Sequence, residues 1–480
     1  MRKVIVIFLF LTFMIPSSFS EGTREEHLDC TTIAVGKDAS ATGSVLIAHN
    51  EDDGGAVEID LSIVERNSFP GSSNLTDGSR IYRENSTLLA LPLPESSYAY
   101  AWSHMKGQDF SDSYINEKGV VIFSDACPSK EKEPDLMYGG IRYYLRRWVA
   151  EQAGSAREAV DLMGQLIEAY GYGDSGRTYT VADSREVWVL HAVYGKHWVA
   201  QRVPDDSVMV VSNCYIINGI NPRDRNNFRG SSDIISYAVG KGWCESEAVF
   251  DFSKAYGDPK AQQSPSNIYR RWLALYLLTG MDFEPTALPF AVKPKEKVSI
   301  EKMMSTMRSH FEGTKYGAQP KEALEAQESF HRSFEYRPVC VITTQESSVI
   351  ELRDDVPDEL SVVWWRASCN PCLSPYVPWY PLAMIKSKTD FPEEYRDGDA
   401  FHTFRDLCDK GDSDYKNVAG IIKSGWSEFE RNLLSSQGSI EKKCYELINE
   451  KKDASRILSY YSNGAAMKAL DIAKETIQEI

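Results

Sequence analysis

Cys30 stands where a cysteine could serve as a nucleophile at the start of a processed chain. The preceding residues 21–29 are polar, with four acidic residues and no apolar periodicity, which is typical of a short exposed leader. Once the leader is removed, Cys30 would carry a thiol and a free α-amino group on one residue. The thiolate is the nucleophilic form of cysteine. The α-amino group, with a pKa of about 7.7–8.0, could accept the thiol proton.

A carboxylate that could bind the resulting ammonium is offered by Asp52. Residues 30–35 and 44–48 are rich in β-forming types, and the segment between them is turn-like, so the sequence predicts a hairpin. If the hairpin bends near residue 41, Cys30 and Asp52 are equally far from the bend and lie opposite one another. Asp52 is therefore the predicted partner of the α-amino group.

Asn213 is the candidate donor to an oxyanion. It ends a predicted strand over residues 208–212, and its side-chain amide can donate a hydrogen bond, with a backbone N–H near Asp125 as a second donor. The alternative is that Cys30 is a buried or disulfide-bonded cysteine and that Asp52 and Asn213 are ordinary turn residues. Each residue taken singly fits that alternative. The cysteine, the leader and the returning carboxylate taken together fit catalysis by an N-terminal cysteine.

Other kinds of catalytic site find no support in the sequence. The eight histidines form no HExxH motif and no closely spaced ligand cluster, so no metal site is predicted. A nucleophile elbow, a Walker-type loop and a GxGxxG motif are all missing, and no cofactor is expected. His191 and His197 flank a predicted hairpin turn and are expected to be solvated. Nine cysteines leave at least one unpaired; Cys369 and Cys372 could form a local disulfide or remain two thiols.

The first twenty residues predict an export signal. Arg2 and Lys3 precede an apolar run over 4–14, and small residues follow at 18–20. The run is shorter than the roughly 20 residues that a spanning helix needs. We therefore expect cleavage of residues 1–20, a secreted or periplasmic protein, and no stable membrane contact afterwards. The net charge of −16 argues against nucleic-acid binding, and the sequence leaves a homo-oligomer open.

The order of predicted elements indicates an α+β protein with antiparallel sheets. Residues 68–90 look like a surface excursion, and helices are predicted over 137–152 and 155–170, with Ser155 as N-cap. A four-stranded meander follows over 178–212. Strands are expected again at 339–343, 348–352 and 360–365, and the chain from about residue 400 is helical, with Trp426, Phe429 and Leu433 on one face. Such an order does not fit a doubly wound fold.

Two stretches, CTTIAVG from Cys30 and LIAHNED ending at Asp52, resemble the dipeptidase A family of cysteine-type N-terminal-nucleophile (Ntn) hydrolases. Those enzymes begin with Cys-Thr-Thr and carry Ala-Arg-Asn-Glu-Asp on the second strand. Further matching motifs are 116–120, 186–189, 198–200, 203–206 leading to Asn213, 250–256, 308–314 and 357–364. The resemblance covers residues 30 to about 385, and its first strands are also similar to those of penicillin V acylases and bile salt hydrolases.

The resemblance implies a four-layer αββα sandwich, which we place over residues 30–395, and autoproteolytic or assisted removal of the leader over 21–29. The helical residues 396–480 would form a C-terminal extension. It also implies a small peptide substrate, because the family hydrolyses dipeptides. In this role Cys30 is the nucleophile, Asp52 binds the α-amine and Asn213 donates to the oxyanion. One residue departs from the family pattern: His49 replaces the usual arginine, so the positive charge beside the thiol would depend on protonation.

Two other functions remain open at this point. An N-acyl amidase, as among the acylase relatives, would cleave an acyl chain from an amine with the same nucleophile. A non-catalytic secreted binding protein on the same scaffold would need no reactive thiol. Arg229 and Arg308 are conceivable clamps for a substrate carboxylate, although surface arginines are commoner.

Overall fold

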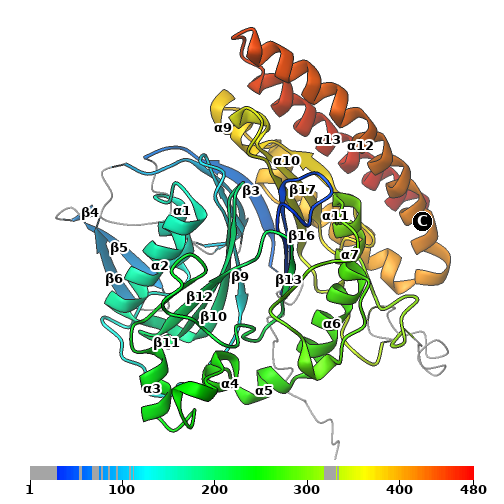
Figure 1. Cartoon of the computed structure of the whole chain (residues 1–480). Coiled ribbons are helices and arrows are strands. Elements are labelled where there is room, and N and C mark those ends of the chain that lie inside the picture. The colour runs from blue at the N-terminus through cyan, green and yellow to red at the C-terminus, as the bar shows by residue number, and fades with distance from the viewer. Residues whose placement is uncertain are drawn as a thin grey trace, which may run out of the picture.

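The computed structural model describes residues 30–52, 57–67, 75–76, 79–84, 87–92, 96–107, 110–111, 113–317, 331 and 334–480. The predicted signal peptide and leader over 1–29 lie outside these residues. Two antiparallel sheets face one another, and helices cover the outer face of each (Figure 1). The predicted α+β class and the αββα layering are confirmed.

The first sheet has seven strands, and the N-terminal hairpin lies at its centre. Its spatial order is β15 (Ala291–Val292), β13 (Val208–Val211), β1 (Thr31–Val35), β2 (Val45–Glu51), β16 (Glu346–Leu352), β17 (Val362–Ser368) and β18 (Val377–Trp379). Every residue of β1 and β2 is buried, because helices cover one face and the second sheet covers the other. The predicted strand over 339–343 is wrong: these residues form turns that lead into β16.

The second sheet has eight strands, with β9 and β10 near its middle. Its order is β14 (Phe228–Gly230), β12 (Trp198–Arg202), β11 (Val187–Gly195), β10 (Tyr172–Ala182), β9 (Val121–Ala126), β8 (Ser113–Asn116), β7 (Tyr100–Met105) and β3 (Ile59–Val64). A third, small sheet comprises β4 (Leu75–Thr76), β5 (Ser79–Glu84) and β6 (Thr87–Pro92). Part of the predicted surface excursion is thus regular antiparallel structure.

The predicted four-stranded meander is divided between the two large sheets. Strands β10, β11 and β12 pair in sequence as expected, but β13 leaves them and pairs with β1 in the first sheet. Alternation of apolar residues does not distinguish these outcomes, because all four strands are largely buried. The crossing brings the end of β13, and Asn213 after it, to the N-terminal strand.

Helices α1 (Tyr144–Ala150) and α2 (Ala156–Tyr170) cover the second sheet. Ser155 caps α2 by accepting a hydrogen bond from the Glu158 N–H, as predicted. The first helix is shorter than the predicted 137–152, since Gly139 and Gly140 adopt positive φ angles just before it.

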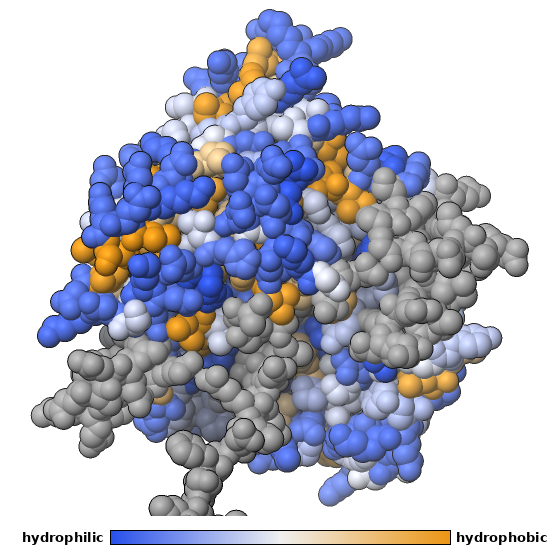
Figure 2. Space-filling model, turned by 180° about the vertical axis from the view of Figure 1, so that it is seen from behind, coloured by the Kyte–Doolittle hydropathy of each residue, from blue (hydrophilic) through white to orange (hydrophobic). Residues whose placement is uncertain are grey.

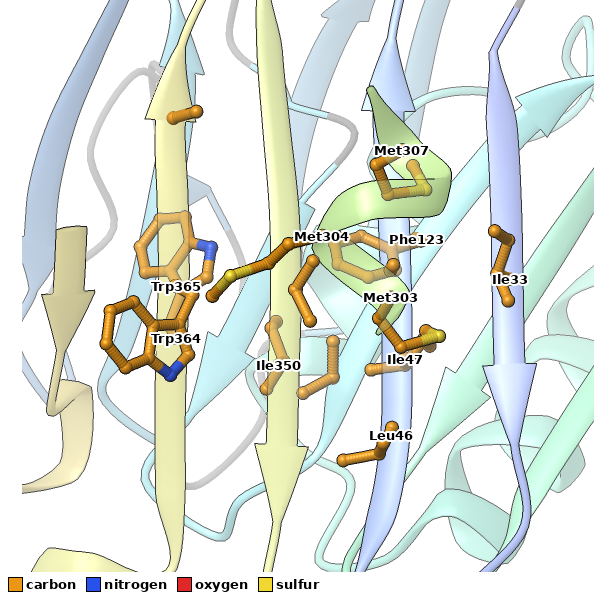
Figure 3. Packing of buried hydrophobic residues seen from close by; sticks show 14 of the residues in the cluster. Ile33, Leu46, Ile47, Phe123, Met303, Met304, Met307, Ile350, Trp364 and Trp365 are labelled. Carbon is orange, nitrogen blue, oxygen red and sulfur yellow. The ribbon is translucent and has the colours of Figure 1, made fainter. Parts of the chain in front are cut away.

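The first sheet is covered by α6 (Pro265–Thr279) and α7 (Ile300–Met307). Figure 3 shows Met303, Met304 and Met307 of α7 over the strands that carry Ile47 and Ile350. Three short helices lie between β14 and α6 in the chain: α3 (Ile234–Gly240), α4 (Phe252–Tyr256) and α5 (Pro259–Gln263). Short 3₁₀ turns occupy Glu247–Val249, Pro285–Ala287 and Asp358–Leu360.

Helices dominate the chain after β18, as predicted. They are α9 (Pro381–Ser387), α10 (Glu393–Arg396), α11 (Asp399–Ser413), α12 (Gly420–Asn449) and α13 (Ser455–Glu479), with a π-helical turn at Tyr415–Ala419. The two longest, α12 and α13, form an antiparallel pair beside β18 and α11 (Figure 1). Trp426, Phe429 and Leu433 of α12 are all buried, which confirms the predicted apolar face.

The buried carboxylate of Glu346 connects the two large sheets. Glu346 of β16 accepts a 2.6 Å hydrogen bond from Nε of Arg366 on the neighbouring β17. The same carboxylate accepts hydrogen bonds from Ser103 (2.6 Å) and Ser113 (3.1 Å), which belong to β7 and β8 of the opposite sheet. Glu346 and Arg366 are 1% and 4% exposed. The charge at Glu346 is therefore neutralised within one sheet and hydrogen-bonded to the other.

The view from behind in Figure 2 shows a mostly hydrophilic surface on which apolar groups form separate small patches. Such scattered apolar residues are normal on a folded protein. Among the described helices, none combines the length and the apolar character that crossing a bilayer requires.

Candidate active site

Cys30 lies immediately before β1, an inner strand of the seven-stranded sheet, next to the central strand β2. Strand β1 is paired with β2 on one side and with β13 on the other. The Cys30 side chain is 3% exposed, and its Sγ is 3.4 Å from Oε1 of Glu51. Cys30 is therefore flanked by its own hairpin partner and by a strand that lies more than 150 residues later in the chain.

The hairpin register differs by one residue from the prediction. Thr31 is paired with Asn50, so the residue opposite Cys30 is Glu51 and not Asp52. The prediction placed the bend at residue 41, whereas the observed pairing centres it between 40 and 41. A shift of one residue exchanges the two faces of a strand, and this shift gives the thiol a different carboxylate neighbour.

Alternation along the two strands sends their side chains to opposite faces. Cys30, Thr32, His49 and Glu51 share the face toward the second sheet, where Thr32 Oγ1 donates a 2.8 Å hydrogen bond to Asp125 of β9. On the other face, Asn50 donates to the backbone oxygens of Met307 and Val339. The candidate nucleophile therefore faces the space between the sheets.

His49 occupies that space between two carboxylates. Its Nε2 is 4.0 Å from Oε2 of Glu51 and 4.0 Å from Oδ1 of Asp125, and its ring stacks on Phe123 with centroids 4.9 Å apart. The side chain is fully buried. Carboxylates at this distance favour the positively charged imidazolium, and burial of the ring disfavours it.

Asp52 is held by two residues that follow the α7 region in sequence. Nη2 of Arg337 lies 2.8 Å from Oδ2 of Asp52, and the Thr344 hydroxyl donates to Oδ1. The carboxylate is 1% exposed. Arg337 and Thr344 were not predicted, because nothing in their local sequence marks them as partners of a residue nearly 300 positions away.

Asn213 lies beside Cys30 in the first sheet. Thr32 is paired with Val211, so the same register, continued past the strand end, places Asn213 opposite Cys30. The Asn213 amide nitrogen donates to the Ala126 carbonyl at 2.9 Å, and its Oδ1 accepts a 2.7 Å bond from Nη2 of Arg270. The structure thus brings Cys30, Glu51 and Asn213 to one end of three adjacent strands.

Arg270 of α6 is a residue of this site that the sequence reasoning missed. It is fully buried and also donates to Oδ1 of Asn267, whose amide nitrogen in turn donates to the Asn213 backbone oxygen. These bonds fix which way the Asn213 amide points. The spacing of Asn267 and Arg270, one turn apart on a helix, is a signal that could have identified the pair.

Other residues singled out in the sequence have partners of their own. Arg229 forms an ion pair with Asp161, and Arg308 forms one with Glu430. The expectation of a solvated His191 is wrong: it is fully buried, bonded to Thr178, and accepts from the Ile216 N–H. Burial and the charge of Arg271 hold the pKa of His191 well below its usual range.

Two sets of potential metal ligands occur among the described residues. Cys30, His49 and Glu51 present ligand atoms within 4.8 Å of one another. So do His310, His331, Cys340 and Cys372, although these residues are far apart in the sequence and match no metal-binding motif. None of the nine cysteines, all of which the structure describes, forms a disulfide, so Cys369 and Cys372 are two thiols.

Comparison with known proteins gives a consistent result. The model of peptidase family C69 matches residues 29–428, which runs past residue 395 into α12. A probable dipeptidase of Latilactobacillus sakei is 30% identical over 387 residues, which is 78% of this chain and 77% of that protein. A probable dipeptidase of Salmonella dublin is 28% identical over 370 residues, covering 73% and 80% of the two chains.

Among solved structures, a mutant conjugated bile acid hydrolase from Clostridium perfringens aligns with 71% of this chain and 89% of its own. The TM-score is 0.33 and the sequence identity is 11%.

Proposed function

Because the chain belongs to peptidase family C69, and is therefore a cysteine-type peptidase that acts on peptide bonds, we propose that it is a dipeptidase whose nucleophile is Cys30. The observation that carries this proposal is the register of the first sheet, which sets Cys30 between Glu51 and Asn213. The names of the dipeptidase relatives support the substrate class, a small peptide with two residues.

In the proposed reaction, removal of residues 1–29 leaves Cys30 with a free α-amino group. This amine takes the thiol proton, and the thiolate attacks the scissile carbonyl carbon. Asn213 and a backbone N–H near Asp125 donate to the oxyanion. The amine then protonates the leaving amino group, the C–N bond breaks, and water hydrolyses the Cys30 thioester to release the acid and restore the thiol.

The surrounding residues have separable roles in this proposal. Asp52, held by Arg337 and Thr344, binds the α-ammonium when it forms. Arg270 orients the Asn213 amide. Residues 1–20 direct export, so the mature enzyme acts outside the cytoplasm, and residues 30–395 and 396–480 are the catalytic domain and its helical extension.

The mature N-terminus provides the direct test. We expect the active form to begin at Cys30, and iodoacetamide to modify that residue and abolish activity, because the alkylated thiol cannot attack. Mass analysis of the N-terminal peptide with and without iodoacetamide measures both. An active form that begins at any other residue would refute the proposal.

Replacing His49 by arginine tests the source of the positive charge. The imidazolium exists only below the pH at which His49 loses its proton, whereas a guanidinium stays charged. The native enzyme should therefore lose kcat/KM as the pH rises, and the His49→Arg variant should retain it further into the alkaline range. Profiles of kcat/KM measured over about pH 6–9 compare the two.

His49→Gln is the control for size and hydrogen bonding, since glutamine carries no charge at any pH. It should be slow throughout the range. Identical alkaline limbs in the native enzyme and the arginine variant would show that the charge of His49 does not govern activity.

A further inference from the structure

A second cluster of reactive side chains lies outside the candidate active site. His310, His331, Cys340 and Cys372 come from four separate positions in the chain, yet one ligand atom of each lies within 4.8 Å of all the others. All four side chains are at least nine-tenths buried. Two thiols and two imidazoles converging in a protein interior are a donor set of the kind found in structural zinc sites.

The spacing of these atoms is close to that of a tetrahedral site. With Zn–S bonds of about 2.3 Å and Zn–N bonds of about 2.0–2.1 Å, the ligand atoms of an ideal tetrahedron are roughly 3.4–3.8 Å apart. Nε2 of His331 is 3.2 Å from Sγ of Cys372 and 3.8 Å from Sγ of Cys340. Both distances lie near this range, and the other ligand atoms are within 4.8 Å of one another.

The outer nitrogens of both imidazoles are bonded to carboxylates. Nδ1 of His310 lies 2.8 Å from Oε1 of Glu312, and Nδ1 of His331 lies 2.5 Å from Oδ1 of Asp412. Such contacts orient a histidine ligand and place the proton on the nitrogen away from the metal. In this cluster they turn Nε2 of His331 toward the two thiols.

We propose that His310, His331, Cys340 and Cys372 bind one structural zinc ion. Two sulfurs and two nitrogens in tetrahedral arrangement select Zn²⁺ over the hard cations that prefer oxygen ligands. Four protein ligands leave no open position, which is the pattern of a structural site. Each thiol loses its proton when its sulfur binds the metal, so uptake of the ion releases protons.

The cluster also has a route from solvent. Cys372 and Glu312 line a cleft of about 460 Å³ between the end of α7 and α12. An entry path is one of the requirements of a credible metal site. The ion could therefore be taken up after folding.

The zinc site would stabilise the segment that holds Asp52. Cys340 lies between Arg337 and Thr344, both of which contact the Asp52 carboxylate. The neighbouring Val339 oxygen accepts a hydrogen bond from Asn50. A metal bond at Cys340 ties this segment to Cys372 after β17 and to His310 after α7. An effect of zinc on dipeptide hydrolysis rests on the proposed role of Asp52. Zinc binding by the four side chains does not depend on that role.

Metal analysis of the purified full-length protein tests the inference. After expression with zinc and without chelators, we expect about one zinc per chain, and less than about 0.1 in Cys340→Ser and Cys372→Ser, since each loses a thiolate ligand. The control is Cys444→Ala, another buried cysteine, on α12, which should keep its zinc. Removing the ion should lower Tm by more than about 5 °C.

Two measurements on the native sequence do not depend on whether the variants fold. Titration of zinc-free protein with Co²⁺ should give the strong visible absorption of tetrahedral, thiolate-bound cobalt, saturating at one equivalent. Thiol modification should release one zinc to a chromogenic chelator. A native protein that holds no zinc and takes up no cobalt, or a Cys340–Cys372 disulfide found by mass spectrometry, would overturn the proposal.

The metal readout is separate from dipeptide hydrolysis. A zinc-loaded protein that does not cleave dipeptides would contradict the proposed function and support the metal site. A protein purified without chelators that cleaves dipeptides fully yet holds no zinc and takes up no cobalt would contradict the metal site alone.

Discussion

Cys30→Ala is expected to lower kcat/KM for dipeptides by on the order of 10⁴-fold or more. Alanine keeps the backbone of β1 and removes only the sulfur, so the acyl-enzyme cannot form. Losses of this size are typical when the nucleophile of a covalent mechanism is deleted. Steady-state kinetics on unblocked dipeptides, with the processed N-terminus verified by mass, measure the effect.

Cys444→Ala is the matched control, because it deletes a buried thiol from α12, far from β1 in sequence and packing. It should leave kcat/KM within about twofold of the native value. N-acyl amino acids tested alongside the dipeptides examine the amidase alternative. A Cys30→Ala enzyme with native activity would point to another nucleophile, and preferential cleavage of N-acyl substrates would favour the amidase.

Arg366→Leu is expected to destabilise the protein by about 3–5 kcal/mol, the range measured when one partner of a buried ion pair is removed. The leucine leaves the Glu346 carboxylate buried between the sheets, where the hydroxyls of Ser103 and Ser113 still donate hydrogen bonds to it. Urea unfolding followed by circular dichroism measures the change in the free energy of unfolding.

The double variant Glu346→Gln/Arg366→Leu separates loss of the pair from loss of packing. It should recover a substantial part of the stability, because the amide carries no charge to bury. Lys452→Ala, which breaks the exposed pair with Glu450, is the control and should change stability little. A double variant no more stable than Arg366→Leu would show that the stranded charge is not the cause.

The fold class and the position of Cys30 before the first strand of a hairpin could be predicted from local patterns. The hairpin could be predicted because β-forming residues lie on both sides of residue 41 with a turn-like segment between them. The register of the hairpin could not be predicted from the sequence, because a turn of several residues can connect the two strands in more than one way. One residue of register decides whether Glu51 or Asp52 is opposite the thiol.

Contacts between distant segments could not be predicted in this way. The pairing of β13 with β1 and the bond from Arg270 to Asn213 depend on tertiary packing. The same holds for Cys340 and Cys372, whose spacing matches no short metal motif. His310 and His331 carry no local signal either, since the metal-binding patterns recognised in sequence place ligands a few residues apart.

The strand order of the first sheet also determines when activity can arise during synthesis. Thr32 is paired with Val211, and His49 with Ser348, so the surroundings of Cys30 require chain that is translated much later. Pairings of such long range form slowly, because the entropy of closing a large loop opposes them. A nascent or truncated chain ending before β16 therefore lacks part of the candidate active site. With Cys30 as the proposed nucleophile, the topology delays peptidase activity until the domain is almost fully made.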